Sequence, residues 1–170
     1  MYSTYSPYRG QTLYNCQIKT MAKVALNIAK AYDNGFIADF EKSKYFQLHK
    51  NAATRADLYS FAIAIAKMEG KEPTDIQTVN SFVRTEYLGN YEALLSALYY
   101  EDKLKDNTDQ IDDICNRDEV YALAEKYANT GFGILKDWNE HLDEETLFYK
   151  LIGWMDNLYQ EIKDEVSSLV

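Results

Sequence analysis

Residues 54–70 read TRADLYSFAIAIAKMEG, and this stretch decides the fold class. Apolar side chains recur in it every three or four residues, at Leu58, Phe61, Ile65 and Met68. That spacing places them on one face of an α-helix, which has about 3.6 residues per turn. Gly70 follows, and glycine readily adopts the left-handed conformation that ends many helices. We therefore expect a helix over residues 54–69.

Two segments before this stretch carry similar signals. Apolar residues within 14–32 repeat at alternating spacings of four and three, and Gly35 follows them as a stop. The aromatic-rich segment 36–50 predicts a shorter helix with a break near its end. Residues 1–10 lack such a pattern, so we expect them to form a flexible arm.

The rest of the chain predicts five further helices. Asn116 and Glu119 have the spacing of a capping box, in which two side chains satisfy free amides at a helix start. The tripeptide at 129–131, Asn-Thr-Gly, is expected to end that helix, and Asp143 is expected to cap the last one. The predicted helices cover residues 74–88, 90–105, 116–129, 134–141 and 143–169.

Strand signals are missing from this pattern, since no segment alternates apolar and polar residues with many β-branched side chains. Two prolines and seven glycines also leave little room for the turns of a β-sandwich. A length of 170 residues suits one domain. We therefore predict an all-α protein in which residues 11–170 form one compact bundle of about seven to nine helices.

The two cysteines, Cys16 and Cys115, lie far apart and in no metal-binding spacing. We expect them to be reduced thiols that act as small core residues. The first residues lack the basic and apolar regions of a signal peptide, and no apolar run reaches the roughly 18 residues of a membrane span. The sequence therefore predicts a cytoplasmic protein that does not enter the membrane.

Charge is divided unevenly along the chain. Residues 1–88 carry 11 Lys and Arg against 8 Asp and Glu, whereas residues 89–170 carry 7 against 19. The first half thus has a balance of +3 and the second a balance of −12, within a net charge of −9. A short basic window lies within residues 42–55, but the sequence pI of about 4.7 opposes affinity for a polyanion. We expect no direct binding to duplex DNA.

Catalytic groups are not recognisable, because the two histidines, His49 and His141, belong to no nucleophile–base or metal motif. We therefore expect no enzymatic activity, no metal and no cofactor. One alternative stays open, because all-helical nucleotide pyrophosphatases hold Mg²⁺ with paired carboxylates. In an enzyme of that kind, the carboxylates would be Glu144, Glu145, Glu161 and Asp164. All four lie on one predicted helix.

Two stretches resemble a known group of proteins. Residues 54–64, followed by Gly70-Lys71 and Pro73, resemble small helical proteins encoded beside bacterial DNA phosphorothioation systems. The segment 123–131, LAEKYANTG, resembles the Tyr-Ala-Asn…Gly segment of the same group, so that the resemblance covers roughly residues 50–136. It implies an accessory component of a DNA modification or restriction system that acts through protein contacts. A phage or mobile-element protein that antagonises such a system would carry the same resemblance.

These observations predict a non-enzymatic, acidic protein-interaction module in prokaryotic DNA defence or in counter-defence. Its partner is expected to be a protein, for example a nucleic-acid-binding protein whose basic surface the module occupies. The tyrosines of residues 1–10 are a further candidate contact, and the oligomeric state is left open. Ten carboxylates are the predicted partner-binding residues: Glu101, Asp102, Asp109, Asp112, Asp113, Asp118, Glu119, Asp143, Glu144 and Glu145.

Overall fold

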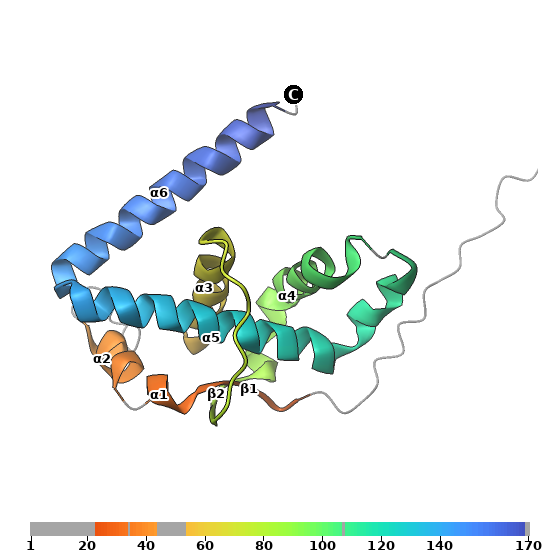
Figure 1. The fold of residues 1–170 in the computed structure, drawn as a ribbon, viewed down its shortest axis with the longest axis horizontal. Helices are drawn as coiled ribbons and strands as arrows, with labels where there is room; N and C mark the ends of the chain where they lie inside the picture. Colours follow the sequence, from red (N-terminus) through yellow and green to blue (C-terminus); the bar gives the residue numbers. More distant parts are fainter. Residues whose placement is uncertain (1–22, 34, 44–53, 107, 169–170) are drawn as a thin grey trace, which may run out of the picture.

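The computed structural model describes residues 23–33, 35–43, 54–106 and 108–168. The protein is mostly helical and carries one small two-stranded sheet (Figure 1). The dominance of helix is thus confirmed, whereas the prediction that strands are absent is wrong. The elements are β1 (Ala25–Ala29), α1 (Lys30–Asp33), α2 (Phe36–Lys42), α3 (Arg55–Met68), β2 (Val79–Arg84), η1 (Thr85–Tyr91), α4 (Glu92–Tyr99), η2 (Tyr100–Leu104), η3 (Thr108–Cys115), α5 (Arg117–His141) and α6 (Glu144–Ser168).

Helix α3 confirms the prediction made from the opening stretch of sequence. Thr54 is its N-cap, and the Asp57 backbone N–H donates to the Thr54 hydroxyl at 3.3 Å. In return the Asp57 carboxylate accepts the Thr54 backbone N–H, which completes a capping box. The helix ends before Gly70, whose φ of 60° is the left-handed conformation that favours glycine.

Helix α5 runs without a break through residues 129–131, so the predicted stop there is wrong. Gly131 lies in mid-helix, at the point where α5 crosses α3. A Cβ added to Gly131 would lie 1.8 Å from the carbonyl oxygen of Ala62, far closer than a carbon and an oxygen that are not bonded can approach. This glycine therefore allows two helix backbones to approach each other, and it does not cap a helix.

The sheet replaces parts of two predicted helices. Strands β1 and β2 pair antiparallel from Ala25 with Arg84 to Ala29 with Val79, and the register shifts between Leu26 and Asn27. The helices predicted over residues 14–32 and 74–88 are therefore wrong at residues 25–29 and 79–84, whereas residues 1–22 lie outside the described residues. Leu26 and Ile28 are both buried, which is the alternation of a strand with one face on the core.

The remaining helix predictions hold in outline. Helix α2 occupies the first half of the segment 36–50, and residues 44–53 lie outside the described residues. Helix α4 and the π-helical turn η2 together cover most of the predicted helix 90–105. The short helix predicted over 134–141 is the last part of α5.

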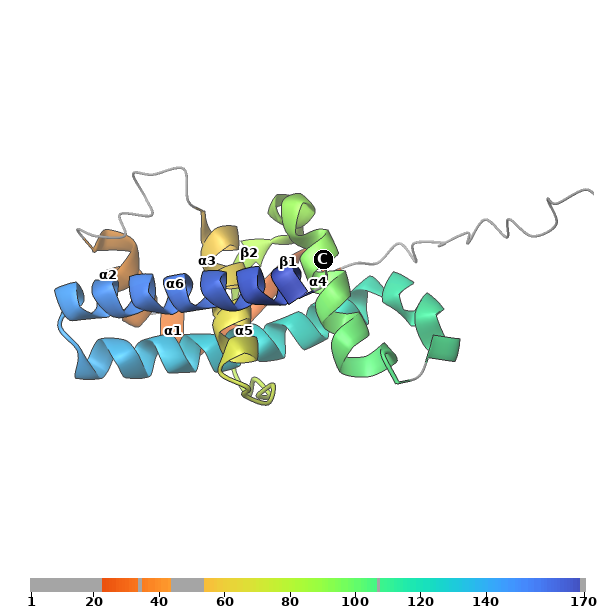
Figure 2. The same ribbon diagram turned by 90° about the horizontal axis from the view of Figure 1, so that it is seen from above.

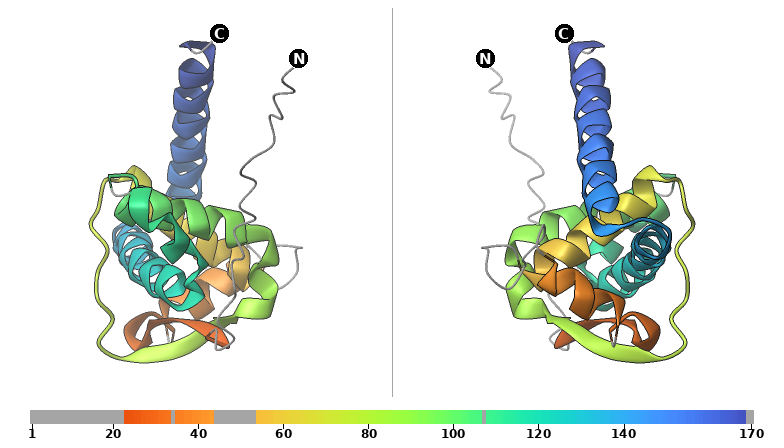
Figure 3. Two further views of the ribbon diagram at one scale, coloured as in Figure 1. Left: turned by 90° about the vertical axis from the view of Figure 1, so that its right-hand side faces the viewer. Right: turned by 90° about the vertical axis from the view of Figure 1, so that its left-hand side faces the viewer.

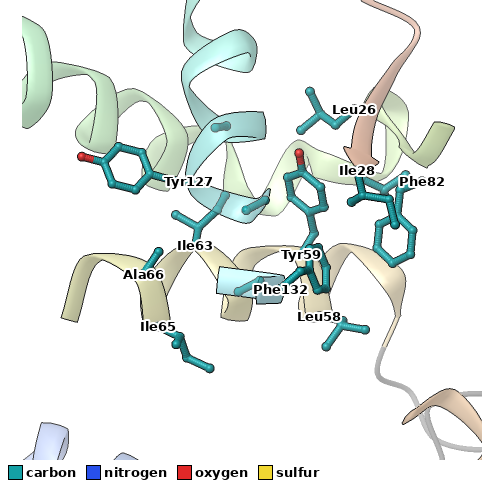
Figure 4. Packing of buried hydrophobic residues seen from close by; sticks show 14 of the residues in the cluster. Leu26, Ile28, Leu58, Tyr59, Ile63, Ile65, Ala66, Phe82, Tyr127 and Phe132 are labelled. Carbon is teal, nitrogen blue, oxygen red and sulfur yellow. The ribbon is translucent and has the colours of Figure 1, made fainter. Parts of the chain in front are cut away.

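The core fills the space between the α3–α5 crossing and the sheet (Figure 4). The fully buried ring of Tyr59 lies 6.0 Å from the Phe82 ring of β2 and 6.1 Å from the Phe132 ring of α5, centroid to centroid. The Tyr59 hydroxyl donates to the backbone carbonyl of Asn27 at 3.0 Å. One tyrosine of α3 thus joins both strands to α5, and its burial raises its pKa well above the ordinary value.

A buried carboxylate fixes β1 to α5. Oε1 of Glu125 accepts the backbone N–H of Asn27 at 2.9 Å and its side-chain amide at 3.0 Å. Oε2 of Glu125 binds the Lys23 ammonium at 2.5 Å. The Asn27 amide lies at the register shift of the sheet, so Glu125 supplies the acceptor that β2 does not.

Helix α6 begins as predicted at Asp143, whose carboxylate accepts the backbone N–H of Thr146 at 2.9 Å. Leu147 and Leu151 are buried, and the Trp154 ring packs edge-on against Phe61 with centroids 5.8 Å apart. Beyond these contacts the helix stands clear of the body (Figures 1 and 3). Seen from above, it runs from the C-terminal end of α5 back toward the α4 end (Figure 2).

Cys115, the last residue of η3, is disulfide-bonded, so the expectation of a reduced thiol is wrong there. The other cysteine of the chain, Cys16, lies outside the described residues.

Candidate functional site

The carboxylates predicted to contact a partner lie around the two ends of α5. Residues 101–119 belong to η2, η3 and the first turn of α5, whereas Asp143, Glu144 and Glu145 follow its last turn (Figure 1). Since α5 has 25 residues, its ends are about 36 Å apart. The ten carboxylates therefore do not form one continuous surface, and each end has its own set of contacts.

Four exposed carboxylates form what we call the acidic corner, where η3 meets α5: Asp112, Asp113, Asp118 and Glu119. Neighbouring cations bind other carboxylates. Arg117 pairs with Glu92 at 2.9 Å, and Lys23 pairs with Glu125. Within the described residues, no ion pair involves a member of the acidic corner. Its negative charge is therefore not neutralised by these cations.

Two members of the acidic corner also stabilise the start of α5. Asp118 accepts the Lys23 backbone N–H at 3.1 Å, and Glu119 accepts the Asn116 side-chain amide at 2.7 Å. The predicted capping box is incomplete, because the Asn116 side chain makes no bond to the helix amides. Negative charge in a first turn also interacts favourably with the helix dipole. Asp112 and Asp113 have no such role among the described contacts and are the most available for a partner.

Two other predicted residues, Glu101 and Asp102, bind groups within the chain. Glu101 pairs with Lys67 at 3.2 Å, and Asp102 pairs with Lys103 at 3.0 Å and accepts a bond from the Tyr127 hydroxyl. Burial opposes the ionisation of Asp102, yet the bonds from Tyr127 and Lys103 outweigh it and lower the pKa of that carboxyl. The side chain of the remaining residue, Asp109, lies outside the described residues.

Tyrosine hydroxyls make several of these internal contacts with carboxylates. The chain has 15 tyrosines, and among those that the structure describes, three donate a hydrogen bond to a carboxylate of another element. Each bond therefore ties two elements together at the edge of the core. The three pairs are Tyr91 with Asp57, Tyr99 with Glu119, and Tyr127 with Asp102.

These bonds predict a loss of stability at high pH. The bond to Asp57 raises the pKa of Tyr91 to about 12, and burial together with the bond to Glu119 raises that of Tyr99 to about 12, from an ordinary value of 10.0. A raised folded pKa means that the contribution is complete below pH 10 and is lost as pH rises toward 12. The free energy of unfolding, measured by urea titration, should fall over that range. Tyr91→Phe should make the fall shallower, and an unchanged slope in that variant would contradict the assignment.

The carboxylates at the other end of α5 serve mainly the start of α6. The Thr146 backbone N–H, together with its hydroxyl, lowers the pKa of the Asp143 carboxyl. Glu144 accepts a hydrogen bond from the Ser43 hydroxyl, which ties α6 to the end of α2. Glu145 is exposed in the first turn, where its charge favours the helix.

The four carboxylates of the alternative magnesium enzyme are not brought together. Glu144 and Glu145 lie in the first turn of α6, and Glu161 lies 17 residues from Glu144 on the same helix. That separation corresponds to about 25 Å, far beyond the span of one metal site. No group of three or more His, Cys, Asp or Glu side chains in the described part of the chain is arranged to hold a metal ion.

A hollow of about 630 Å³, which no pattern in the sequence predicts, lies between the start of α3, β2 and η1. In the wall of this hollow, the Arg55 guanidinium lies 4.9 Å from the centre of the Phe82 ring. The same guanidinium binds the Glu41 carboxylate at 2.6 Å. The Asp57 carboxylate accepts the hydrogen bond from the Tyr91 hydroxyl. The third charged residue of the lining, Arg84, pairs with Glu86 at 3.3 Å. The charged groups that line the hollow are thus bound to neighbours, and the rest of its wall is a mixed aromatic and polar surface.

No family model, curated protein or solved structure matches the chain. Over the residues that are described, no helix combines the length and the apolar character needed to cross a membrane.

Proposed function

We propose that the protein is a non-enzymatic protein-interaction module that docks through its acidic corner onto a basic surface of a partner. The observation that carries this proposal is the distribution of ion pairs around the corner. Arg117 and Lys23 lie beside it, yet they bind Glu92 and Glu125. Asp112 and Asp113 are left exposed and without an ion pair among the described residues.

Complementary charge favours this use of the surface. Carboxylates without internal partners attract a basic surface at long range, raise the association rate and exclude acidic partners. Such attraction is screened over about 8 Å at physiological ionic strength, so the complex should weaken as salt is added. The internal bonds of Asp118 and Glu119 keep the corner in a fixed shape, which reduces the entropy lost on binding.

The resemblance of residues 50–136 to proteins encoded beside DNA phosphorothioation systems supplies the biological setting of the proposal. A basic surface that reads the DNA backbone is the kind of surface an acidic corner fits. We therefore place the module in prokaryotic DNA defence, or in counter-defence by a phage or mobile element, with a nucleic-acid-binding protein as its partner.

The test compares two double variants that remove the same charge from different places. Asp112→Asn with Asp113→Asn removes two of the four charges of the acidic corner, whereas Glu161→Gln with Asp164→Asn neutralises two exposed carboxylates of α6. Each protein is used to capture the partner from host extract at about 0.15 M salt. The first variant should recover about tenfold less partner than the wild-type protein, or less still, and the second should recover as much as the wild type. Equal recovery with both would contradict the proposal.

The same α6 variant tests the alternative enzyme, because Glu161 and Asp164 are two of its expected magnesium ligands. The wild-type protein should not hydrolyse nucleoside triphosphates in the presence of Mg²⁺. Turnover that disappears in the α6 variant and persists in the corner variant would replace the proposed function with the hydrolase.

A further inference from the structure

Helix α6 carries a second apolar stripe that is separate from its contacts with the body. Five large apolar side chains lie on it at successive spacings of three, four, three and four residues. Each is between 39 and 64 % exposed, and the four that follow Trp154 lie beyond the contacts of the helix with the body. That part of α6 stands clear of the body (Figure 3). The five are Ile152, Met155, Tyr159, Ile162 and Val166.

The spacing and the direction of this stripe both indicate a helical partner. An average repeat of about 3.5 residues is that of a left-handed coiled-coil seam. Successive residues of an α-helix are rotated by about 100° around its axis. The centre of the stripe is therefore about 90° around the helix from the face that carries Leu147, Leu151 and Trp154, which contacts the body. One face of α6 thus anchors the helix, and a second face is presented away from the anchor.

We infer that this stripe is a self-association site, at which α6 of a second copy of the chain packs in antiparallel orientation. A twofold axis near residue 160 would pair Tyr159 with Ile162 of the second copy, and Met155 with Val166 of the second copy. These two kinds of pair use four of the five side chains, because Ile152 would face position 169 of the second copy, which lies outside the described residues. The occupant is a copy of the same helix because the residues that flank the stripe are complementary to themselves.

The flanking charges decide between the two possible orientations. Asp156 and Lys163 are exposed, lie on the same edge of the stripe, and are seven residues apart. In an antiparallel pair this edge faces its own copy, so each Asp156 lies beside Lys163 of the other chain. In a parallel pair the same two charges would face the other edge, where the apolar Leu151 and Leu158 lie, and would be desolvated without a partner.

The shape of the molecule also favours the antiparallel pair. Each body is attached at the N-terminal end of its α6, so antiparallel helices hold the two bodies at opposite ends of the seam (Figure 1). The helix is about 36 Å long, several times the screening length of about 10 Å at 0.1 M salt. Repulsion between two chains of net charge −9 is therefore weak in this arrangement.

The seam is short, so the dimer should be reversible. A stable interface involves about 20–30 residues from each partner, and a seam of two heptads offers fewer. We expect a dissociation constant in the micromolar range. The average mass measured by sedimentation should rise from that of one chain, 19.7 kDa, toward twice that value between about 1 µM and 1 mM protein.

Matched variants test the seam and its orientation. Tyr159→Glu should weaken association at least about a hundredfold, whereas Asn157→Glu, which adds the same charge on the opposite side of α6, should not. Asp156→Lys and Lys163→Asp should each weaken it about tenfold, and the double variant should restore it, because both ion pairs re-form with their signs exchanged. A wild-type protein that stays at 19.7 kDa throughout, or a double variant no better than the singles, would overturn the inference. Neither result bears on the acidic corner, which lies on η3 and α5.

Discussion

Gly131→Ala should reduce the free energy of unfolding by about 3 kcal/mol or more, the largest effect expected of any single methyl group in this protein. The added Cβ would lie 1.8 Å from the Ala62 carbonyl oxygen and 2.4 Å from the Ala62 carbonyl carbon. Both are backbone atoms, so no side-chain rotation relieves the clash and the two helices have to separate. Alanine stabilises a helix interior by only about 1 kcal/mol relative to glycine, which is too little to compensate.

Gly153→Ala is the matched control for this prediction. Gly153 is also inside a helix, but a Cβ there would meet no atom within 4 Å. The substitution should therefore leave stability unchanged or raise it by up to about 1 kcal/mol. Urea unfolding of both variants measures the difference. If Gly131→Ala unfolds at the wild-type midpoint, α3 and α5 do not cross at Ala62 as described.

Glu125→Ala should reduce the free energy of unfolding by about 3 kcal/mol, which is the second largest effect expected. The substitution leaves the backbone N–H of Asn27 without its acceptor, and an unpaired buried amide costs about 1–3 kcal/mol. The Lys23 ammonium also loses its partner, but its side chain is 36 % exposed, so water limits that part of the loss. Loss of the packed side chain accounts for the remainder.

Glu125→Gln is the control that separates the hydrogen bonds from the charge. The glutamine oxygen can still accept from Asn27, so most of the stability should remain and only the ion pair with Lys23 is lost. Hydrogen exchange at the Asn27 amide should speed up in Glu125→Ala and stay slow in Glu125→Gln. Equal protection in both variants would show that β1 is not held by this carboxylate.

The elements that the sequence predicts well are those whose signals lie within one segment. Helix α3 has its cap at Thr54, its stop at Gly70 and an apolar face between them, all within 17 residues. Helix α6 likewise begins at the Asp143 cap. Helices with local caps can be predicted because the chemistry that starts and ends them is next to them in the chain.

The sheet could not be predicted in this way, because its strands are about 50 residues apart. Ala25, Ile28 and Tyr32 fit a helical repeat, while Leu26 and Ile28 fit the alternation of a strand. The choice between these two patterns is made by pairing with β2 and by the Glu125 carboxylate of α5. The prediction that a helix ends at Gly131 is wrong for a similar reason, since the close approach of Ala62 is a tertiary contact.

The candidate site was predictable in composition but not in arrangement. The excess of carboxylates after residue 89 is visible in the sequence. Its division between the two ends of α5, and the bonds that Asp102 and Glu119 accept from tyrosines, depend on which elements are neighbours in space. Contacts of this kind distinguish Asp112 and Asp113 from Asp118 and Glu119, their neighbours in the acidic corner.

The most direct test of the central claim is competition between duplex DNA and the protein for the captured partner. The acidic corner is proposed to occupy a basic surface that binds nucleic acid, so the two ligands should exclude each other. At constant ionic strength, added duplex DNA should release the partner from the immobilised protein in proportion to the DNA that the partner binds. A partner that holds DNA and this protein together in one complex would contradict the account.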